Sequence, residues 1–211
     1  MVSPVEFIPI AEEIGLIVPI GEWVLKQACA EAGKWPDHMK IAVNLSPAQF
    51  RSENLVQMVF SALTSCGVPG CRLELEITES ALLQNNETTL AAVQQLRAFG
   101  VRISMDDFGT GYSSLSYLQT FPFDKIKIDR SFVDKLSNGD GAVAILRAII
   151  SLAHSLGVST IAEGVETQEQ LDKVRAEGCT EMQGFIFSHA RPANELAELL
   201  LRRAESTRSA A

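Results

Sequence analysis

Short apolar stretches of strand length alternate with stretches of helical pattern along almost the whole of this 211-residue chain. The expected strands are 41–45, 72–77, 101–105, 124–128, 158–162 and 182–187, and the expected helices that follow them are 55–66, 87–99, 114–118, 143–156, 168–177 and 194–203. Glycine closes several of these helices, as at Gly67, Gly100 and Gly157. Strands that alternate with helices form a parallel sheet, so we expect an α/β fold.

Helical segments are also expected before the first strand. Ser3 and Pro4 are typical of a helix start, with serine as the cap and proline in the first turn. Pro9 is expected to interrupt this helix, and Gly15 to end the short segment that follows. The next helix is expected over Ile20–Ala32.

The expected strands have one polar side. Polar and apolar residues alternate in Arg72–Glu76 and in Lys125–Asp129, and Arg102, Ser104 and Asp106 share one side of the strand between them. Strands covered by helices on both faces tend to be apolar throughout, so the polar side disfavours an open sheet. The pattern instead favours a barrel whose interior becomes a wet site at the carboxyl ends of the strands.

A complete barrel of this class has about eight strands and about 250 residues. The chain offers fewer strands, so we expect a TIM-like (β/α) barrel that lacks its first strand or strands, with the gap at the N-terminus. One domain is expected over residues 1–203, followed by a frayed, small and polar tail at 204–211.

Composition narrows the class of protein. The net charge of −8 disfavours binding to DNA, RNA or anionic lipid, although an anionic ligand remains possible where a bound cation reverses the local field. There is no apolar run long enough to cross a membrane and no secretion signal, so a cytoplasmic chain is expected, with any membrane tether upstream in the parent protein. The cysteines show no paired or zinc-ligand spacing and are expected to be reduced thiols: Cys29, Cys66, Cys71 and Cys179.

Polar side chains stand at the carboxyl end of every expected strand. In chain order they are Asn44, Glu76, Asp106 with Asp107, Lys127 with Asp129, Glu163, and Gln183, with Glu79 and Glu166 a few residues beyond two of these ends. In a barrel these ends meet at one mouth, where several carboxylates cannot all stay ionised without cations. Asn, Asp and Glu oxygens without His or Cys are typical ligands of Mg²⁺ or Mn²⁺. Lys127 would add a fixed positive charge that can orient a water or a phosphate oxygen.

Each of these residues also has an ordinary structural interpretation. Glu76 or Asp106 can cap a helix, and Glu79 or Glu166 can be an acid favoured by a helix N-terminus. Gly109 and Gly111 in the loop after Asp107 and Phe108 can be turn residues, Asp107 can cap that loop, and Lys127 can be a solvated charge. Their recurrence in register on successive strands favours one shared site. The histidines fit no catalytic spacing, and there is no nucleophile elbow or P-loop.

Six ordered motifs resemble those of the EAL domain family, the bacterial phosphodiesterases of cyclic di-GMP. They are NLSPAQF (Asn44–Phe50), ELEITES (Glu74–Ser80), MDDFGTGYSSLSYL (Met105–Leu118), FDKIKIDRSFV (Phe123–Val133), IAEGVET (Ile161–Thr167) and MQGFIFSHARP (Met182–Pro192). The resemblance implies a TIM-like barrel in which two divalent cations, Mg²⁺ or Mn²⁺, activate a water that opens cyclic di-GMP to pGpG.

The resemblance also implies roles for individual residues. Asn44, Glu76, Asp106 and Glu163 resemble metal ligands, with Asp107 and Asp129 at or near the second metal. Lys127 resembles the residue that positions or activates the attacking water, with Glu163, Lys127 and Asp107 as the expected catalytic set. The residues implied for substrate and loop contacts are Glu79, which would anchor the loop from Asp107 to Ser114, Phe108, Gly109, Thr110, Gly111, Gln183 and Glu166.

One departure from the family pattern affects the expected activity. The strand that carries Glu-Ala-Leu would precede the segment at which this chain begins, so a ligand Glu and a nearby Arg are not among its residues. We therefore expect little phosphodiesterase activity from this chain alone, although its parent can be active. The alternatives are a module that binds cyclic di-GMP without cleaving it and, more remotely, a metal-dependent barrel enzyme with another phosphate substrate. GGDEF, PAS or receiver modules in the parent protein, and a homodimer through the face near the loop that starts at Asp107, are the implied partners.

Overall fold

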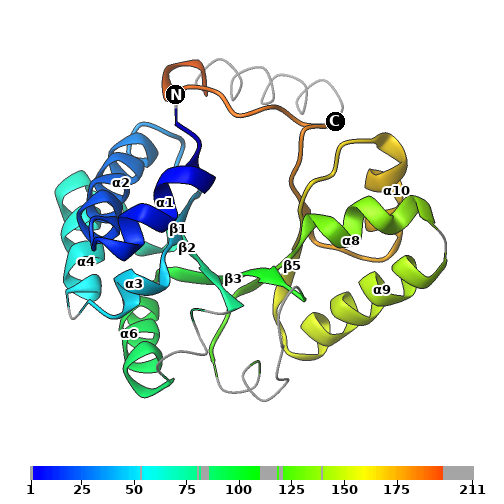
Figure 1. The fold of residues 1–211 in the computed structure, drawn as a ribbon, viewed down its shortest axis with the longest axis horizontal. Coiled ribbons are helices and arrows are strands. Elements are labelled where there is room, and N and C mark those ends of the chain that lie inside the picture. The colour runs from blue at the N-terminus through cyan, green and yellow to red at the C-terminus, as the bar shows by residue number, and fades with distance from the viewer. Residues whose placement is uncertain are drawn as a thin grey trace.

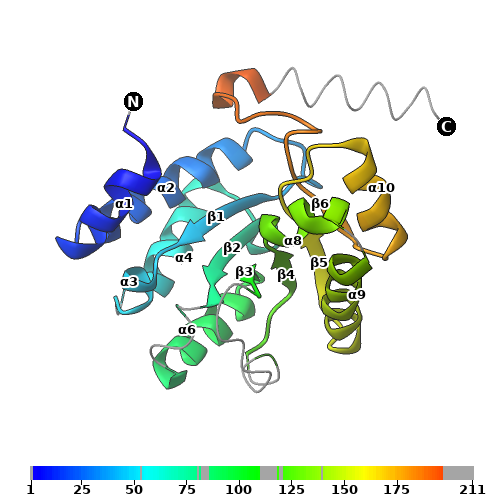
Figure 2. The same ribbon diagram turned by 45° about the vertical axis from the view of Figure 1, so that its right-hand side comes forward.

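The described part of the chain contains one curled sheet of six parallel strands with helices around its outside (Figure 1). The computed structural model describes residues 2–52, 54–79, 81, 86–109, 118, 121–138 and 140–196. The strands are β1 (Ile41–Leu45), β2 (Leu73–Thr78), β3 (Arg102–Phe108), β4 (Lys125–Ile128), β5 (Ser159–Ala162) and β6 (Glu181–Met182). They lie side by side in chain order around the curve of the sheet, as Figure 2 shows. The expectation of a parallel, barrel-like α/β fold is confirmed.

Helices occupy the segments between the strands. They are α1 (Pro4–Glu13), α2 (Ile17–Ala32), α3 (Pro47–Phe50), α4 (Leu55–Cys66), α6 (Asn86–Ala98), α8 (Arg130–Asp134), α9 (Asp140–Ser155) and α10 (Gln168–Ala176), with short 3₁₀ turns at Gly70–Arg72 and Lys135–Asn138. Residues 193–196 are helical as well. Within the described residues, none of these helices combines the length and apolar character that a membrane crossing requires.

The hydrophobic core lies between the outer face of the sheet and the helices. Leu75, Ile103 and Ile126 on neighbouring strands are fully buried in one cluster with Leu25 of α2 and Val59 of α4. Each such side chain stabilises the fold by about 1.5–3 kcal/mol. The outward residues of β2, β3 and β4 are therefore apolar, and the alternate residues are left to face the concave inner side.

Local hydrogen bonds explain why helices start directly after strands. Ser46 follows β1 and forms a reciprocal capping box with Gln49 at the start of α3. Thr167 forms the same arrangement with Gln170 at the start of α10. These side chains satisfy backbone donors that a helix N-terminus leaves without a partner.

The predicted break at Pro9 is wrong. α1 runs without interruption from Pro4 to Glu13 and contains Pro9. Proline there removes one hydrogen bond to the carbonyl of Val5, which lies at the exposed start of the helix, and Val5 itself is 83% exposed.

Two strands differ by more than one residue from the lengths expected. β3 extends through Asp106 and Asp107 to Phe108, so its acids lie inside the strand rather than after it. β6 ends at Met182 because the chain turns at Gly184, where an added Cβ would lie 2.1 Å from the carbonyl oxygen of Val165. The short helix α8 was not expected. Thr110, Gly111, the predicted helix 114–118 apart from Leu118, and the predicted tail 204–211 lie outside the described residues.

Candidate functional site

A buried lysine stands at the centre of a group of acids on the inner face of the sheet. The ammonium nitrogen of Lys127 on β4 lies 2.8 Å from an oxygen of Glu76, 2.9 Å from one of Asp106 and 2.6 Å from one of Glu163. These acids come from β2, from β3 and from the end of β5. The carboxylates outnumber the ammonium, so the group keeps an excess of negative charge.

Burial and crowding change the pKa values of this group in a consistent direction. Burial raises the pKa of Glu76 and of Glu163; Lys127 lowers both, and the neighbouring acids raise them again, which leaves both above their ordinary value of 4.5. Burial acts to lower the pKa of Lys127, but its ion pairs outweigh this and hold it well above its ordinary value. Lys127 is therefore an ammonium at neutral pH, and its acids are held close together at a cost that a further cation would reduce.

Backbone geometry places the adjacent acids Asp106 and Asp107 at the same rim. Successive residues of a regular strand point to opposite faces. The pairing of β3 with β4 is irregular between Met105 and Phe108, and Asp107 has a φ of 55°, the left-handed conformation that aspartate tolerates better than most residues. Burial raises the pKa of Asp107, and Asp106 and Asp129 raise it further. A residue in a strained conformation at a charged rim is a marker of a functional site.

Three of the predicted ligands satisfy the distance requirement for holding one ion. Asp106, Asp107 and Glu163 each offer a carboxylate oxygen, and these oxygens lie within 4.8 Å of one another. Both carboxylate oxygens of Glu79 are buried and have no hydrogen-bond partner among the described residues. Oxygen donors without sulfur or imidazole, in excess over the nearby cation, fit a hard divalent cation.

The other predicted ligands lie around this group. Asn44 is the register partner of Glu76 and is exposed on the inner side of β1. Asp129 follows β4 and caps α8 through a 3.0 Å bond from the amide of Ser131. This cap was not predicted from the sequence. The carboxylate of Asp129 is also close enough to Asp107 to raise the pKa of Asp107.

A small cavity of about 210 Å³ adjoins the acidic group at the ends of β5 and β6. It is lined by Arg130, Glu163, Gly164, Glu166, Gln183, Gly184 and Phe185. Glu166 forms a 3.0 Å ion pair with Arg130, which the sequence did not predict. The predicted residues Gln183 and Glu166 thus lie beside Glu163.

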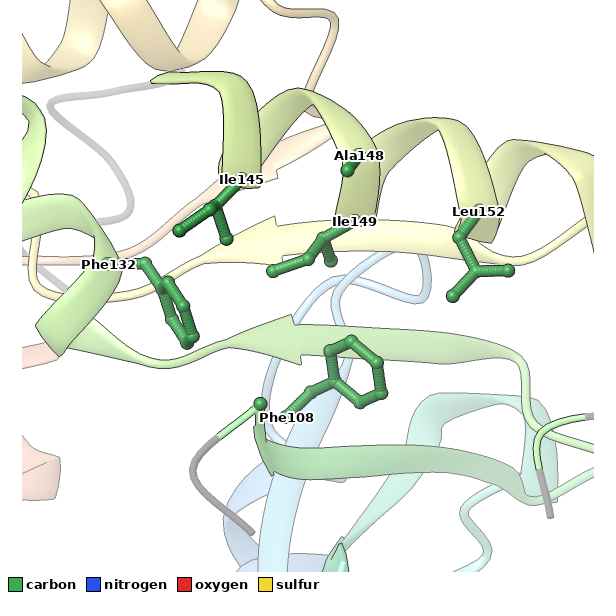
Figure 3. Close-up of a pocket in the computed structure, with 7 residues that line it drawn as sticks. Phe108, Phe132, Ile145, Ala148, Ile149 and Leu152 are labelled. Carbon is green, nitrogen blue, oxygen red and sulfur yellow. The ribbon is translucent and has the colours of Figure 1, made fainter. Parts of the chain in front are cut away.

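Phe108 and Gly109 face a different surface. Phe108 is buried and lines an open apolar groove of about 490 Å³ with Phe132 and residues of α9 (Figure 3). Gly109 has a φ of 92°, and an added Cβ would lie 2.8 Å from the ring of Phe132. These two residues thus pack the end of β3 against the helices. Thr110 and Gly111 lie outside the described residues.

A second layer of charge lies deeper on the inner face and was not predicted as part of the site. Lys125 binds Glu74 at 3.0 Å and Glu181 at 2.7 Å. The alternation of Lys125–Asp129 and Arg72–Glu76 indicated that these residues share the polar side, but it did not indicate which pairs form.

Comparison with known proteins gives a consistent result. Residues 1–190 match the EAL domain family. MucR of Pseudomonas aeruginosa, named a bifunctional diguanylate cyclase/cyclic di-GMP phosphodiesterase, is 43% identical over 200 residues, which are 93% of this chain and 29% of MucR. The chain spans 24% to 29% of the length of four curated relatives that it matches.

Solved structures of complexes with c-di-GMP or cy-diGMP are similar to this chain. The PaMucR phosphodiesterase in complex with c-di-GMP has a TM-score of 0.88 and 44% identity, covering 92% of this chain and 81% of that chain. Klebsiella pneumoniae BlrP1 with manganese and cy-diGMP has a TM-score of 0.76 and 30% identity, covering 82% of this chain and 44% of that chain. The structure of BlrP1 with calcium and cy-diGMP is also similar to this chain.

Proposed function

The chain belongs to the EAL domain family, and we propose that it is a metal-dependent phosphodiesterase domain that hydrolyses cyclic di-GMP to linear pGpG. The observation that carries the proposal is the meeting of Asp106, Asp107 and Glu163 around a rim that also holds the Lys127 ammonium. In the reaction a water oxygen bonds to one phosphorus as the bond from that phosphorus to a 3′ oxygen breaks, and the 3′ oxygen takes a proton.

We propose two divalent cations, Mg²⁺ or Mn²⁺, as cofactors. Their proposed ligands are Asn44, Glu76, Asp106, Asp107, Asp129 and Glu163. Such cations, when bound, acidify a water and neutralise charge on the phosphate. The oxygen-only donor set and the manganese and calcium present with cy-diGMP in BlrP1 support this assignment.

Lys127 is proposed to orient the attacking water rather than to remove its proton. Its raised pKa keeps it protonated near neutral pH, so it can donate hydrogen bonds to an attacking water or to a phosphate oxygen. Asp107 and Glu163 are carboxylates at the same rim and can accept a proton from that water. Deep burial of Lys127 fixes the direction of its ammonium, which is the main requirement for a positioning group.

The remaining site residues are proposed to contact the ligand or to support the rim. Gln183 and Glu166 line the cavity beside Glu163, which supports a ligand contact for Gln183 and a supporting role for Glu166. Glu79 is buried and directly follows Thr78, the register partner of Asp106, and its role as the anchor of the loop after Asp107 stays a prediction. Phe108 and Gly109 are proposed to fix the start of the loop through the groove beside α9.

The test is the appearance of pGpG when the 211-residue chain is incubated with cyclic di-GMP and Mn²⁺ or Mg²⁺. Turnover is expected to be slow, so the assay uses excess protein and long incubation. Product that Glu163→Gln fails to make supports a phosphodiesterase. Binding of cyclic di-GMP without product supports the alternative, a non-catalytic binding module, and fast turnover overturns the expectation of impaired activity. Absence of both binding and product contradicts the proposal.

The partners and the location of the protein are further proposals. MucR carries a diguanylate cyclase activity in its name, and the chain spans a minority of each relative, so GGDEF, PAS or receiver modules in the parent protein stay a prediction. A cytoplasmic location and a homodimer stay predictions too. Light scattering of the purified chain at several concentrations tests the homodimer.

A further inference from the structure

Lys125 connects two strands that do not pair with each other. Its ammonium nitrogen lies 3.0 Å from Glu74 on β2 and 2.7 Å from Glu181 on β6, while Lys125 itself is on β4. The sheet order places β3 between β2 and β4, and β5 between β4 and β6. The bonds therefore cross the concave inner face. Lys125 and Lys127 are two residues apart on one strand, so their side chains point to the same face and the Lys125 bonds lie next to the Lys127 group.

β6 is the shortest strand of the described sheet, and hydrogen bonds between Thr160 and Thr180 tie the chain to β5 just before it. It is two residues long and lies at one end of the sheet order, with Ile161 opposite Glu181 and Ala162 opposite Met182 on β5. A short end strand has few ladder hydrogen bonds to hold it, whereas β2 and β3 pair over five residue positions.

The residue directly after β6 belongs to the proposed ligand site. The amide of Gln183 donates to the carbonyl of Ala162 at 2.8 Å, and the amide of Val165 donates to the carbonyl of Gln183 at 3.0 Å. Gln183 also lines the cavity beside Glu163. Its position relative to the acids of β2 and β3 therefore depends on these two bonds and on the position of β6.

We propose that Lys125 and Glu181 are positioning residues, whose ion pair holds β6 against the inner face so that Gln183 reaches a ligand bound at the acidic rim. The ligand part of this inference rests on the proposed function. Glu74 completes the arrangement: it is 4% exposed, so it needs a cation, and Lys125 supplies a shared one. Glu181 is the accessible member, with a side chain 44% exposed, which makes it the milder point at which to break the pair.

A merely structural role makes a different prediction from a positioning role. If the ion pair only stabilises the fold, its removal should lower the free energy of unfolding and speed amide exchange in all strands alike. A pair that positions β6 would change β6 and Gln183 selectively. Hydrogen exchange resolves these alternatives without any ligand.

The first experiment measures amide hydrogen exchange in the unliganded 211-residue chain with Glu181→Gln. We expect the amides of Gln183 and Val165 to exchange about tenfold faster, which is the loss of one charge-assisted bond, while those of β2 and β3 stay unchanged. The matched control is Glu169→Gln, the same substitution in an exposed pair with Lys173 on α10, which should leave Gln183 unchanged. Uniform change along the sheet, or no change at Gln183, overturns the inference.

The second experiment is a double-mutant cycle on the dissociation constant of cyclic di-GMP, measured with Ca²⁺. Lys125→Met and Gln183→Ala should each weaken binding about tenfold, and the double variant no more than either one, because Lys125 acts through Gln183. Losses that multiply in the double variant overturn the inference. Glu181→Gln replaces Lys125→Met in the cycle if the latter does not fold.

The two experiments separate this inference from the proposed function. If the unaltered chain does not bind cyclic di-GMP with Ca²⁺, the proposed function fails, and the exchange of Gln183 in Glu181→Gln still decides whether the ion pair positions β6. If the unaltered chain binds cyclic di-GMP, and Lys125→Met and Glu181→Gln behave like it in binding and in exchange, the positioning role is wrong while the proposed function stands.

Discussion

The ammonium of Lys127 lies 2.6 Å from a carboxylate oxygen of Glu163, and this pair joins β4 to the end of β5 inside the curled sheet. The same ammonium contacts Glu76 and Asp106. The pair thus fixes the geometry of an acidic rim while leaving it with too little positive charge. Divalent cations are the chemistry that such a rim fits best.

Glu163→Gln should weaken Mn²⁺ binding by roughly 10- to 100-fold, because it removes a charged oxygen from the group that Asp106 and Asp107 complete. Calorimetry of Mn²⁺ binding checks this. Glu22→Gln removes a carboxylate from an exposed pair with Lys26 on α2 and should leave the affinity unchanged. Equal Mn²⁺ affinity in Glu163→Gln and the unaltered chain would mean that the ions bind elsewhere.

Lys127→Met should lower the free energy of unfolding of the metal-free chain by about 3–5 kcal/mol, since three clustered carboxylates lose their common cation. Saturating Mn²⁺ should reduce the difference, because it binds the folded state and supplies positive charge. Urea unfolding with and without Mn²⁺ measures both quantities. Lys26→Met, at an exposed lysine that pairs with Glu22 on α2, is the control. A loss of stability that Mn²⁺ leaves unchanged would contradict this explanation.

The metal-free chain should become less stable as pH rises through the range just above 4.5. The folded-state pKa values of Glu76 and Glu163 are raised, so in that range the folded state binds more protons than the unfolded state and loses stability as they leave. Glu163→Gln should therefore gain in stability relative to the unaltered chain as pH increases, and Mn²⁺ should reverse the trend. Urea unfolding in EDTA from about pH 4.5 to 8 tests this. An opposite slope of the difference would show that Lys127 outweighs burial.

Gly109→Ala should destabilise the chain by about 1 kcal/mol more than Gly157→Ala. Both glycines have positive φ, but an added Cβ meets the ring of Phe132 only at Gly109, and nothing lies within 4 Å at Gly157. Thermal or urea unfolding of the two variants gives the difference. Adding Phe132→Leu to Gly109→Ala should recover part of it; equal losses for the two glycines would remove the packing argument.

The periodic pattern of apolar residues was sufficient to predict the order of strands and helices. The run Lys125–Asp129 alternates because its apolar residues face the helices and its lysines face inward. β5 departs from this rule, because Thr160 is the buried register partner of Ile126 and Ile161 is that of Lys127. Pro9 shows the limit of such rules, because a single lost hydrogen bond at an exposed helix start does not end the helix. The short β6 shows another limit: its end depends on the contact of Gly184 with Val165, which is distant in sequence.

The sequence was sufficient to predict that the site lies at the carboxyl ends of the strands, but not which side chains contact one another there. Adjacent acids on a strand would point to opposite faces, and only the irregular pairing and the left-handed Asp107 place Asp106 and Asp107 at one rim. The partners of Lys125 depend on how strongly the sheet curves, which no local pattern encodes. Phe108 lies in the motif beside these acids but packs under α9, a contact that its place in the motif did not indicate.

A calorimetric titration of cyclic di-GMP into the 211-residue chain, with Ca²⁺ and separately with EDTA, tests directly whether the acidic rim binds its ligand through a metal ion. We expect saturable binding with the ion, weakened by about tenfold or more in EDTA and by a similar factor in Asp106→Asn. Binding of equal strength in EDTA, or the absence of binding with Ca²⁺, would contradict this expectation.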